Sequence, residues 1–173
     1  MSSDNPLEPV WRTYQITRDC LRIAQRTVRR ADARLLRGTD FLGDALTASS
    51  ERIQRSRDES DDFVILSLWV AFERAVLSFL REKGRGLLAV HPASLAGALY
   101  GKFENEIEYW KTEEMLDLFR QDLGAQLIGD AKNIKKHRDW IAHRNPRRPS
   151  PGAVTPVFAY KILSEVLERI GRL

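Results

Sequence analysis

Apolar residues recur at three- and four-residue steps in every long segment of this 173-residue chain, a spacing typical of amphipathic α-helices. No segment alternates apolar and polar residues over the length of a strand, and no Asn-Gly or Asp-Gly pair marks a hairpin. The sequence therefore predicts an all-α fold with a long N-terminal helix. A chain of this length suits one hydrophobic core, so we expect residues 1–173 to form a single domain.

The expected helices are separated by glycine, proline and polar residues. Asp61 and Asp62 precede the most apolar helix and are expected to cap its start, because carboxylates are favourable at helix N-termini. The segment between Gly84 and Lys102 is expected to be irregular, with at most a short helical turn after its His-Pro pair. The expected helices are 14–38, 39–57, 62–84, 103–122, 123–144 and 157–170.

Composition and cysteine usage indicate a cytoplasmic protein. The only cysteine, Cys20, cannot form an internal disulfide, and the first residues do not show a basic segment followed by an apolar run. The apolar run from Phe63 to Leu80 is long enough to cross a bilayer, but Glu73 and Arg74 lie at its centre, where a charge is costly. We therefore expect a buried helix of a soluble protein and no membrane contact.

Positive charge is concentrated towards the C-terminus. Residues 131–148 contain seven Lys and Arg residues and one Asp, which gives a net charge of +6, whereas residues 61–130 carry −5. A concentrated basic segment favours a polyanionic partner such as RNA. A solvated helix face followed by a basic loop is the other explanation.

Two charged residues interrupt apolar helix faces. Glu73 falls on the apolar side of helix 62–84, and Arg138 occupies the position between Ile134 and Ile141 on the apolar stripe of helix 123–144. A buried charge without a partner costs several kcal/mol, so we expect these two side chains to form an ion pair in the core. The pair is either purely structural or part of a site that includes His143.

His143 follows Arg138 by five positions, which is about 140° around an ideal helix. The two side chains therefore converge only with a loosened last turn, with the reach of the arginine, or with a second copy across a dimer. Asp139 lies four residues before His143 and can orient its imidazole. The other two histidines are interpreted as incidental: His91 lies in the irregular connection, and His137 is expected to point into solvent. The three histidines lack metal-binding spacing, so neither a metal nor another cofactor is expected.

The segment from Arg138 to His143, RDWIAH, resembles the Arg-x4-His signature of the HEPN superfamily of small all-helical domains. Asp139 matches the polar residue that follows the arginine in this signature. The helix WVAFERAVLSFL is similar to the one that packs on the motif, and Glu73 lies where many members have an acidic residue. The likeness covers residues 60–170, the HEPN-like core, and implies an up-and-down helical bundle to which the chain adds an extra long N-terminal helix. Asn145 replaces a tyrosine of members paired with nucleotidyltransferase antitoxins, so an antitoxin that modifies this tyrosine is not expected.

The resemblance implies a metal-independent endoribonuclease, a toxin or antiviral-defence effector that forms a homodimer and has an antitoxin or defence-system partner protein. It implies that His143 transfers the proton and Arg138 stabilises the phosphorane, with Glu73 and Asp139 in supporting roles. RNA cleavage by the adjacent 2′-hydroxyl leaves a 2′,3′-cyclic phosphate. The residues expected to attract the RNA backbone are Lys132, Lys135, Lys136, Arg144, Arg147 and Arg148.

Two other functions stay open. A non-catalytic HEPN-like module would bind a nucleotide, RNA or a protein, with Arg138 and Glu73 serving only as a core ion pair. A helical interaction or assembly protein would have no nucleic-acid role. RNA cleavage distinguishes the enzyme from both, and RNA binding distinguishes the module from the assembly protein.

Overall fold

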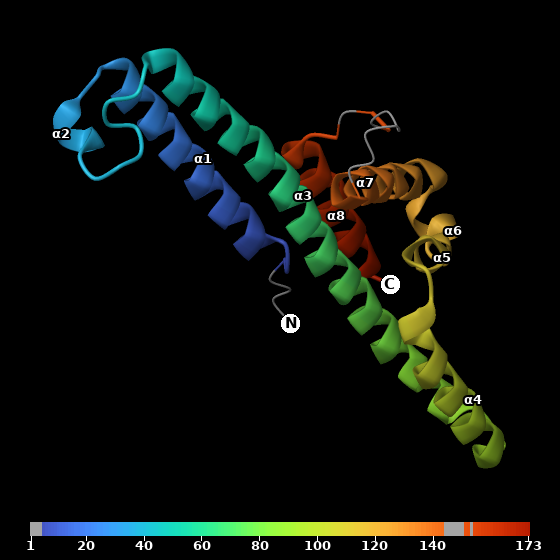
Figure 1. Ribbon diagram of the computed structural model, residues 1–173. Helices are drawn as coiled ribbons and strands as arrows, with labels where there is room; N and C mark the ends of the chain where they lie inside the picture. Colours follow the sequence, from blue (N-terminus) through green and yellow to red (C-terminus); the bar gives the residue numbers. More distant parts are fainter. Residues whose placement is uncertain (1–4, 144–150, 153) are drawn as a thin grey trace.

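The computed structural model describes residues 5–143, 151–152 and 154–173 (Figure 1). In these residues every regular element is a helix, which confirms the predicted all-α fold. The α-helices are α1 (Glu8–Arg29), α2 (Ala33–Leu36), α3 (Leu46–Gly84), α4 (Ala93–Glu106), α5 (Thr112–Asp117), α6 (Arg120–Leu123), α7 (Ala125–His143) and α8 (Pro156–Ile170). Two 3-10 helices, Arg85–Ala89 and Ile107–Tyr109, flank α4.

The 39-residue helix α3 organises the molecule and is about 58 Å long at 1.5 Å per residue. In Figure 1, α1 lies along its N-terminal half, α7 and α8 lie against its middle, and α4 returns along its C-terminal end. The prediction of two separate helices, 39–57 and 62–84, is wrong. Neither glycine nor proline occurs between residues 46 and 83, so nothing in the backbone interrupts the helix.

Asp61 connects α3 to α1 and does not cap a helix. The Tyr14 hydroxyl donates a hydrogen bond to Asp61 Oδ1 at 2.7 Å, and Arg18 Nη1 donates to the same oxygen at 3.1 Å. Burial raises the pKa of Tyr14 to about 12, and the hydrogen bond to the Asp61 carboxylate adds to the increase. Asp61, which the sequence analysis assigned to a helix cap, therefore joins α3 to α1.

The first helix ends earlier than predicted, at Arg29 and not near Gly38. Ala31 adopts a left-handed conformation with φ 49°, which a helix cannot continue through. Asp32 then accepts hydrogen bonds from the backbone N–H groups of Arg34 and Leu35 and so caps the short helix α2.

The segment between residues 84 and 102, predicted to be irregular, is mostly helical. Pro92 directly precedes α4, and helix starts tolerate its missing N–H. Gly84 lets the two helices approach closely, because a Cβ atom there would lie 2.1 Å from Phe103 Cε1. Arg81 of α3 binds Glu104 of α4 at 3.6 Å. The predicted helix 103–122 is divided into the end of α4, the second 3-10 helix, α5 and part of α6.

The core lies where α3 crosses α7 and α8. Trp69, Phe72 and Val76 of α3 are at most 1% exposed, as predicted for its apolar face. Leu163 and Val166 of α8 are fully buried in the same cluster. Helix α8 and the described part of helix α7 agree with the predicted helices 157–170 and 123–144.

Helix α3 with its 3-10 extension also has the length and apolar composition of a membrane-spanning helix. In its most apolar 18-residue window, 39% is buried inside the protein. The buried side chains of α3 pack against the other helices of the protein.

Candidate functional site

The core-facing stripe of α7 runs through His137, not through Arg138. Ile134 and Ile141 are buried as predicted, and His137 between them is only 7% exposed. Arg138 is half-buried, with 29% of its side chain exposed. The spacings 134-137-141 and 134-138-141 both fit three- and four-residue steps, so the pattern alone does not distinguish them. The prediction that His137 points into solvent is wrong.

His137 packs through its ring. It stacks on Trp140 with ring centroids 5.9 Å apart and an interplanar angle of 29°. Its Nδ1 atom is buried and has no hydrogen-bond partner among the described residues. The imidazole therefore contributes packing at a position that the sequence analysis assigned to solvent.

The predicted ion pair between Glu73 and Arg138 is not formed between these two described residues. Arg138 Nη1 instead binds Asp139 Oδ1 at 3.0 Å, and Glu73 accepts a hydrogen bond from the hydroxyl of Thr112. Both charged side chains are only partly buried, so each is stabilised by water and a nearby polar group. Thr112, at the start of α5, was not identified from the sequence because nothing in its local pattern places α5 beside α3.

Asp139 is the centre of a charged network on α7. It binds Lys135 Nζ at 2.7 Å as well as Arg138, and Lys135 lies 3.7 Å from Glu113 of α5. Partial burial opposes ionisation of Asp139, but the hydrogen bonds from Lys135 and Arg138 outweigh it and lower the pKa of Asp139. The hydrogen bond to Asp139 raises the pKa of Lys135. Lys135 and Asp139 are therefore both charged at neutral pH, and their charges cancel.

His143 lies at the C-terminal end of the described part of α7 and is exposed. It forms no hydrogen bond with Arg138 or Asp139, two residues that the structure describes. The single helix thus does not bring the imidazole and the guanidinium together, in agreement with their separation of about 140°. What the chain presents is a half-buried, carboxylate-bound arginine and, one turn further, an accessible imidazole.

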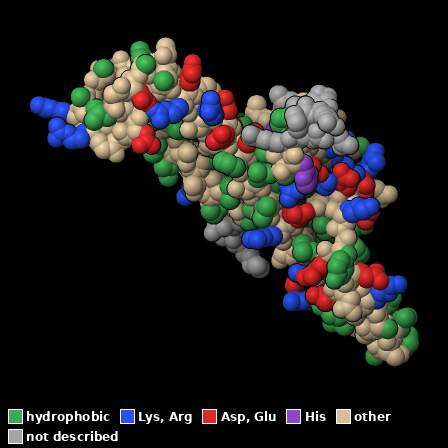
Figure 2. Space-filling model, viewed as in Figure 1, with side chains coloured by type: hydrophobic (Ala, Val, Ile, Leu, Met, Phe, Trp, Pro, Cys, Tyr) green, Lys and Arg blue, Asp and Glu red, His purple; other side chains and the backbone are tan. Residues whose placement is uncertain are grey.

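The predicted RNA-binding residues differ in availability. Lys132 binds Asp117 at 2.6 Å, and Lys135 belongs to the Asp139 network. Lys136 is exposed. Figure 2 shows Lys and Arg side chains interspersed with Asp and Glu over this side of the molecule. Arg144, Arg147 and Arg148 lie outside the described residues.

Among the described residues, His, Cys, Asp and Glu side chains do not form a group of three that could hold a metal ion.

Comparisons with known proteins do not assign the chain to a family. No protein-family model matches it, and neither a curated protein nor a solved structure matches it. The functional conclusion therefore depends on the residues of α7 and their surroundings.

Proposed function

We propose that this protein is a HEPN-type, metal-independent endoribonuclease that acts as a toxin or antiviral-defence effector. In this proposal it is cytoplasmic and works as a homodimer in which two His143 side chains face one cleft, with an antitoxin or defence-system protein as a further partner. The observation that carries the proposal is that one helix holds a half-buried Arg138 in place through Asp139 and presents an exposed His143 beyond it.

The proposed reaction uses only protonatable and cationic side chains. His143 acts as the general base or acid for attack of a 2′-hydroxyl on the adjacent phosphorus. Arg138 binds two non-bridging phosphate oxygens, because guanidinium is planar and always charged. Because Arg138 and His143 diverge on one helix, each active pair in the proposed dimer combines the arginine of one copy with the histidine of the other.

RNA cleavage in a chelator tests this function. Purified protein incubated with single-stranded RNA and EDTA is expected to produce fragments that end in a 2′,3′-cyclic phosphate, detected by mass spectrometry of the fragment ends. EDTA leaves the expected reaction unchanged because His143 and Arg138 need no metal. Intact RNA under conditions in which the protein binds it contradicts the enzyme, and cleavage that EDTA abolishes contradicts the proposed chemistry.

A second candidate, a non-catalytic module that binds a nucleotide, RNA or a protein, is favoured by the neutralised charges. Lys132, Lys135 and Arg138 each bind a carboxylate within 3.0 Å. A phosphate must compete with these carboxylates before it can bind the cations. Such a module would bind RNA weakly and would not cut it.

Replacing Asp139 with asparagine is expected to increase affinity for RNA about 3- to 10-fold and to steepen the salt dependence by about one released counterion. The substitution frees Arg138 and Lys135 for phosphate while preserving the size of the side chain. Binding is measured by fluorescence anisotropy across a salt series.

Asp130→Asn provides a matched control on the same helix. Asp130 accepts hydrogen bonds from the neutral Gln126 amide, so this variant loses the same charge without freeing a cation. Equal increases in affinity for the two variants would show that only net charge matters, and would contradict a phosphate-binding role for the Asp139 network.

A further inference from the structure

Helices α1 and α3 share an apolar face that no other described segment of the chain covers. Ile16 and Ile23 of α1 are 66% and 60% exposed, and Phe63 of α3 is 62% exposed. Phe63 lies nine residues before the buried Phe72, which places the two rings on opposite sides of α3. The uncovered face is therefore directed away from the core. Exposed apolar residues that gather on one surface indicate an interaction site.

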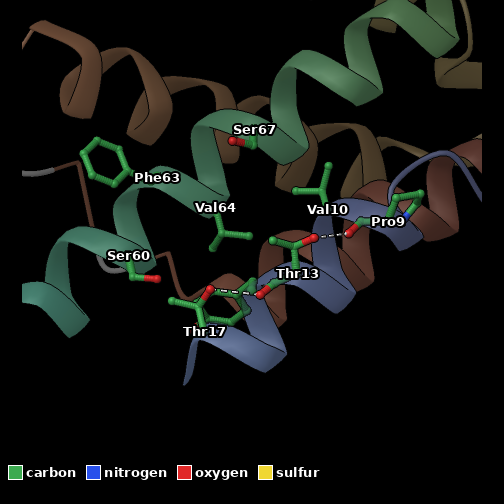
Figure 3. Close-up of a pocket in the computed structure, with 9 residues that line it drawn as sticks. Pro9, Val10, Thr13, Thr17, Ser60, Phe63, Val64 and Ser67 are labelled. Carbon is green, nitrogen blue, oxygen red and sulfur yellow. Dashed lines mark hydrogen bonds between the residues drawn. The ribbon is translucent and has the colours of Figure 1, made fainter. Parts of the chain in front are cut away.

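A groove of about 420 Å³ runs between the two helices on this face (Figure 3). Its lining carries no charge: Pro9, Val10, Thr13, Tyr14, Thr17, Ser60, Phe63, Val64 and Ser67. The hydroxyls of Thr13 and Thr17 donate to the carbonyl oxygens of Pro9 and Thr13 at 2.9 and 3.0 Å, as the dashed lines in Figure 3 mark. These two hydroxyls thus already have acceptors, and the groove accommodates apolar groups.

A second groove continues the surface along α1. It has a volume of about 330 Å³ and extends from Cys20 and Ile23 to Leu35 and Phe41. The residues that line it are also uncharged. We call the two grooves with Ile16 the α1–α3 face. Hydrophobic side chains reach the surface at this end of the molecule in Figure 2.

We propose that the α1–α3 face binds the same face of a second copy of this chain, so that two α1–α3 pairs form a four-helix bundle. In a two-fold arrangement of this kind, each α1 lies beside the α3 of the second copy. The side chains of Phe63 and Ile16 then enter the opposing groove. The interface is separate from the proposed cleft between His143 side chains, because α7 packs on another side of α3 than α1 does (Figure 1). A chain that uses both interfaces forms assemblies larger than a dimer.

The charges that border the face favour a second copy over other occupants. The outer edge of α1 carries one aspartate and three arginines, spaced with Ile16 and Ile23 at three- and four-residue steps: Arg12, Asp19, Arg26 and Arg30. The outer edge of α3 carries three carboxylates and two arginines, and it is acidic because one of these arginines, Arg52, already binds Asp44 of the same chain: Glu51, Arg52, Arg55, Asp58 and Glu59. Two-fold packing places each basic edge against an acidic one. RNA or an anionic bilayer would be repelled by the acidic edge.

The size of the face matches that of a stable dimer. Helix α1 has 22 residues and is about 33 Å long, and two adjacent helices are about 20 Å wide. The face therefore covers about 660 Å² on each copy, comparable with the ~800 Å² per partner of a standard interface.

Analytical ultracentrifugation tests this interface. Wild-type protein is expected to self-associate as its concentration rises, to a dimer through this face alone and to larger assemblies where the His143 dimer also forms. The variant Ile16→Glu/Phe63→Glu is expected to raise the dissociation constant of the α1–α3 interface at least about 10-fold. Leu95→Glu is the control, because Leu95 is 45% exposed on α4 and outside the face. A wild-type protein that stays monomeric at about 100 µM overturns the proposal. A dimer whose dissociation constant is the same in the double variant also overturns it, and assigns dimerisation to another surface.

Chemical labelling of Cys20 tests the interface in the wild-type protein and so does not depend on a variant that folds. It is exposed in the described chain and is the only cysteine of the sequence. A maleimide probe is expected to label it more slowly in concentrated wild-type protein than in dilute protein, because dimerisation covers the second groove. Labelling that is independent of concentration while the protein dimerises overturns the proposal, as does monomeric protein that binds anionic vesicles and protects Cys20 there.

Discussion

Replacing His143 with alanine is expected to lower the rate of RNA cleavage about 10²-fold or more and to leave the RNA dissociation constant nearly unchanged. An imidazole is the side chain that most often transfers protons in catalysis, and the exposure of His143 means that the substitution removes little packing. Single-turnover cleavage and anisotropy, measured on the same preparations, separate the chemical step from binding.

His91→Ala is the matched control for this experiment. His91 is also exposed, but it lies beside α4, outside the charged network of α7. We expect its cleavage rate to equal that of the wild type. If His143→Ala retains activity within about threefold of the wild type, then His143 does not transfer the proton. If both variants bind RNA and the wild type does not cut it, the binding module is the better assignment.

The sequence alone located those helices whose ends are marked by proline or glycine. Helix α8 begins at Pro156, whose ring restricts the backbone, and ends before Gly171, whose backbone is the least restricted. The start of α3 was misassigned because Asp61 and Asp62 have the composition of an N-terminal cap. The Asp61 carboxylate instead binds Tyr14 and Arg18 of α1, a contact across 43 to 47 residues that no local pattern encodes.

The sequence indicated which residues of α7 belong to the candidate site, but not which residues they contact. The helix bearing Arg138, Asp139 and His143 forms as expected, because its apolar spacing is regular over five turns. The orientation of its core face depends on a choice between residues 137 and 138, which only packing against α3 and α8 decides. The partners Thr112 and Glu113 come from a short helix whose position depends on the 3-10 turn before it.

Replacing Trp69 with alanine is expected to lower the free energy of unfolding by about 3–5 kcal/mol. Its side chain is 1% exposed and lies 5.3 Å from the ring of Phe72, at the level where α3 packs against α7 and α8. Because the same contacts hold α7 in place, we expect RNA cleavage to fall only where the variant unfolds. Urea denaturation followed by circular dichroism measures the loss as a lower midpoint with an unchanged slope.

Val70→Ala is the matched control for Trp69→Ala, since the next residue of the same helix is 38% exposed. We expect it to cost less than about 1 kcal/mol, because its removed methyl groups leave no enclosed cavity. A loss below about 1 kcal/mol for Trp69→Ala as well would contradict the placement of the core at the crossing of α3 with α7 and α8. The position of Arg138 and His143 would then lose its structural basis, because α7 reaches that position only by packing on this part of α3.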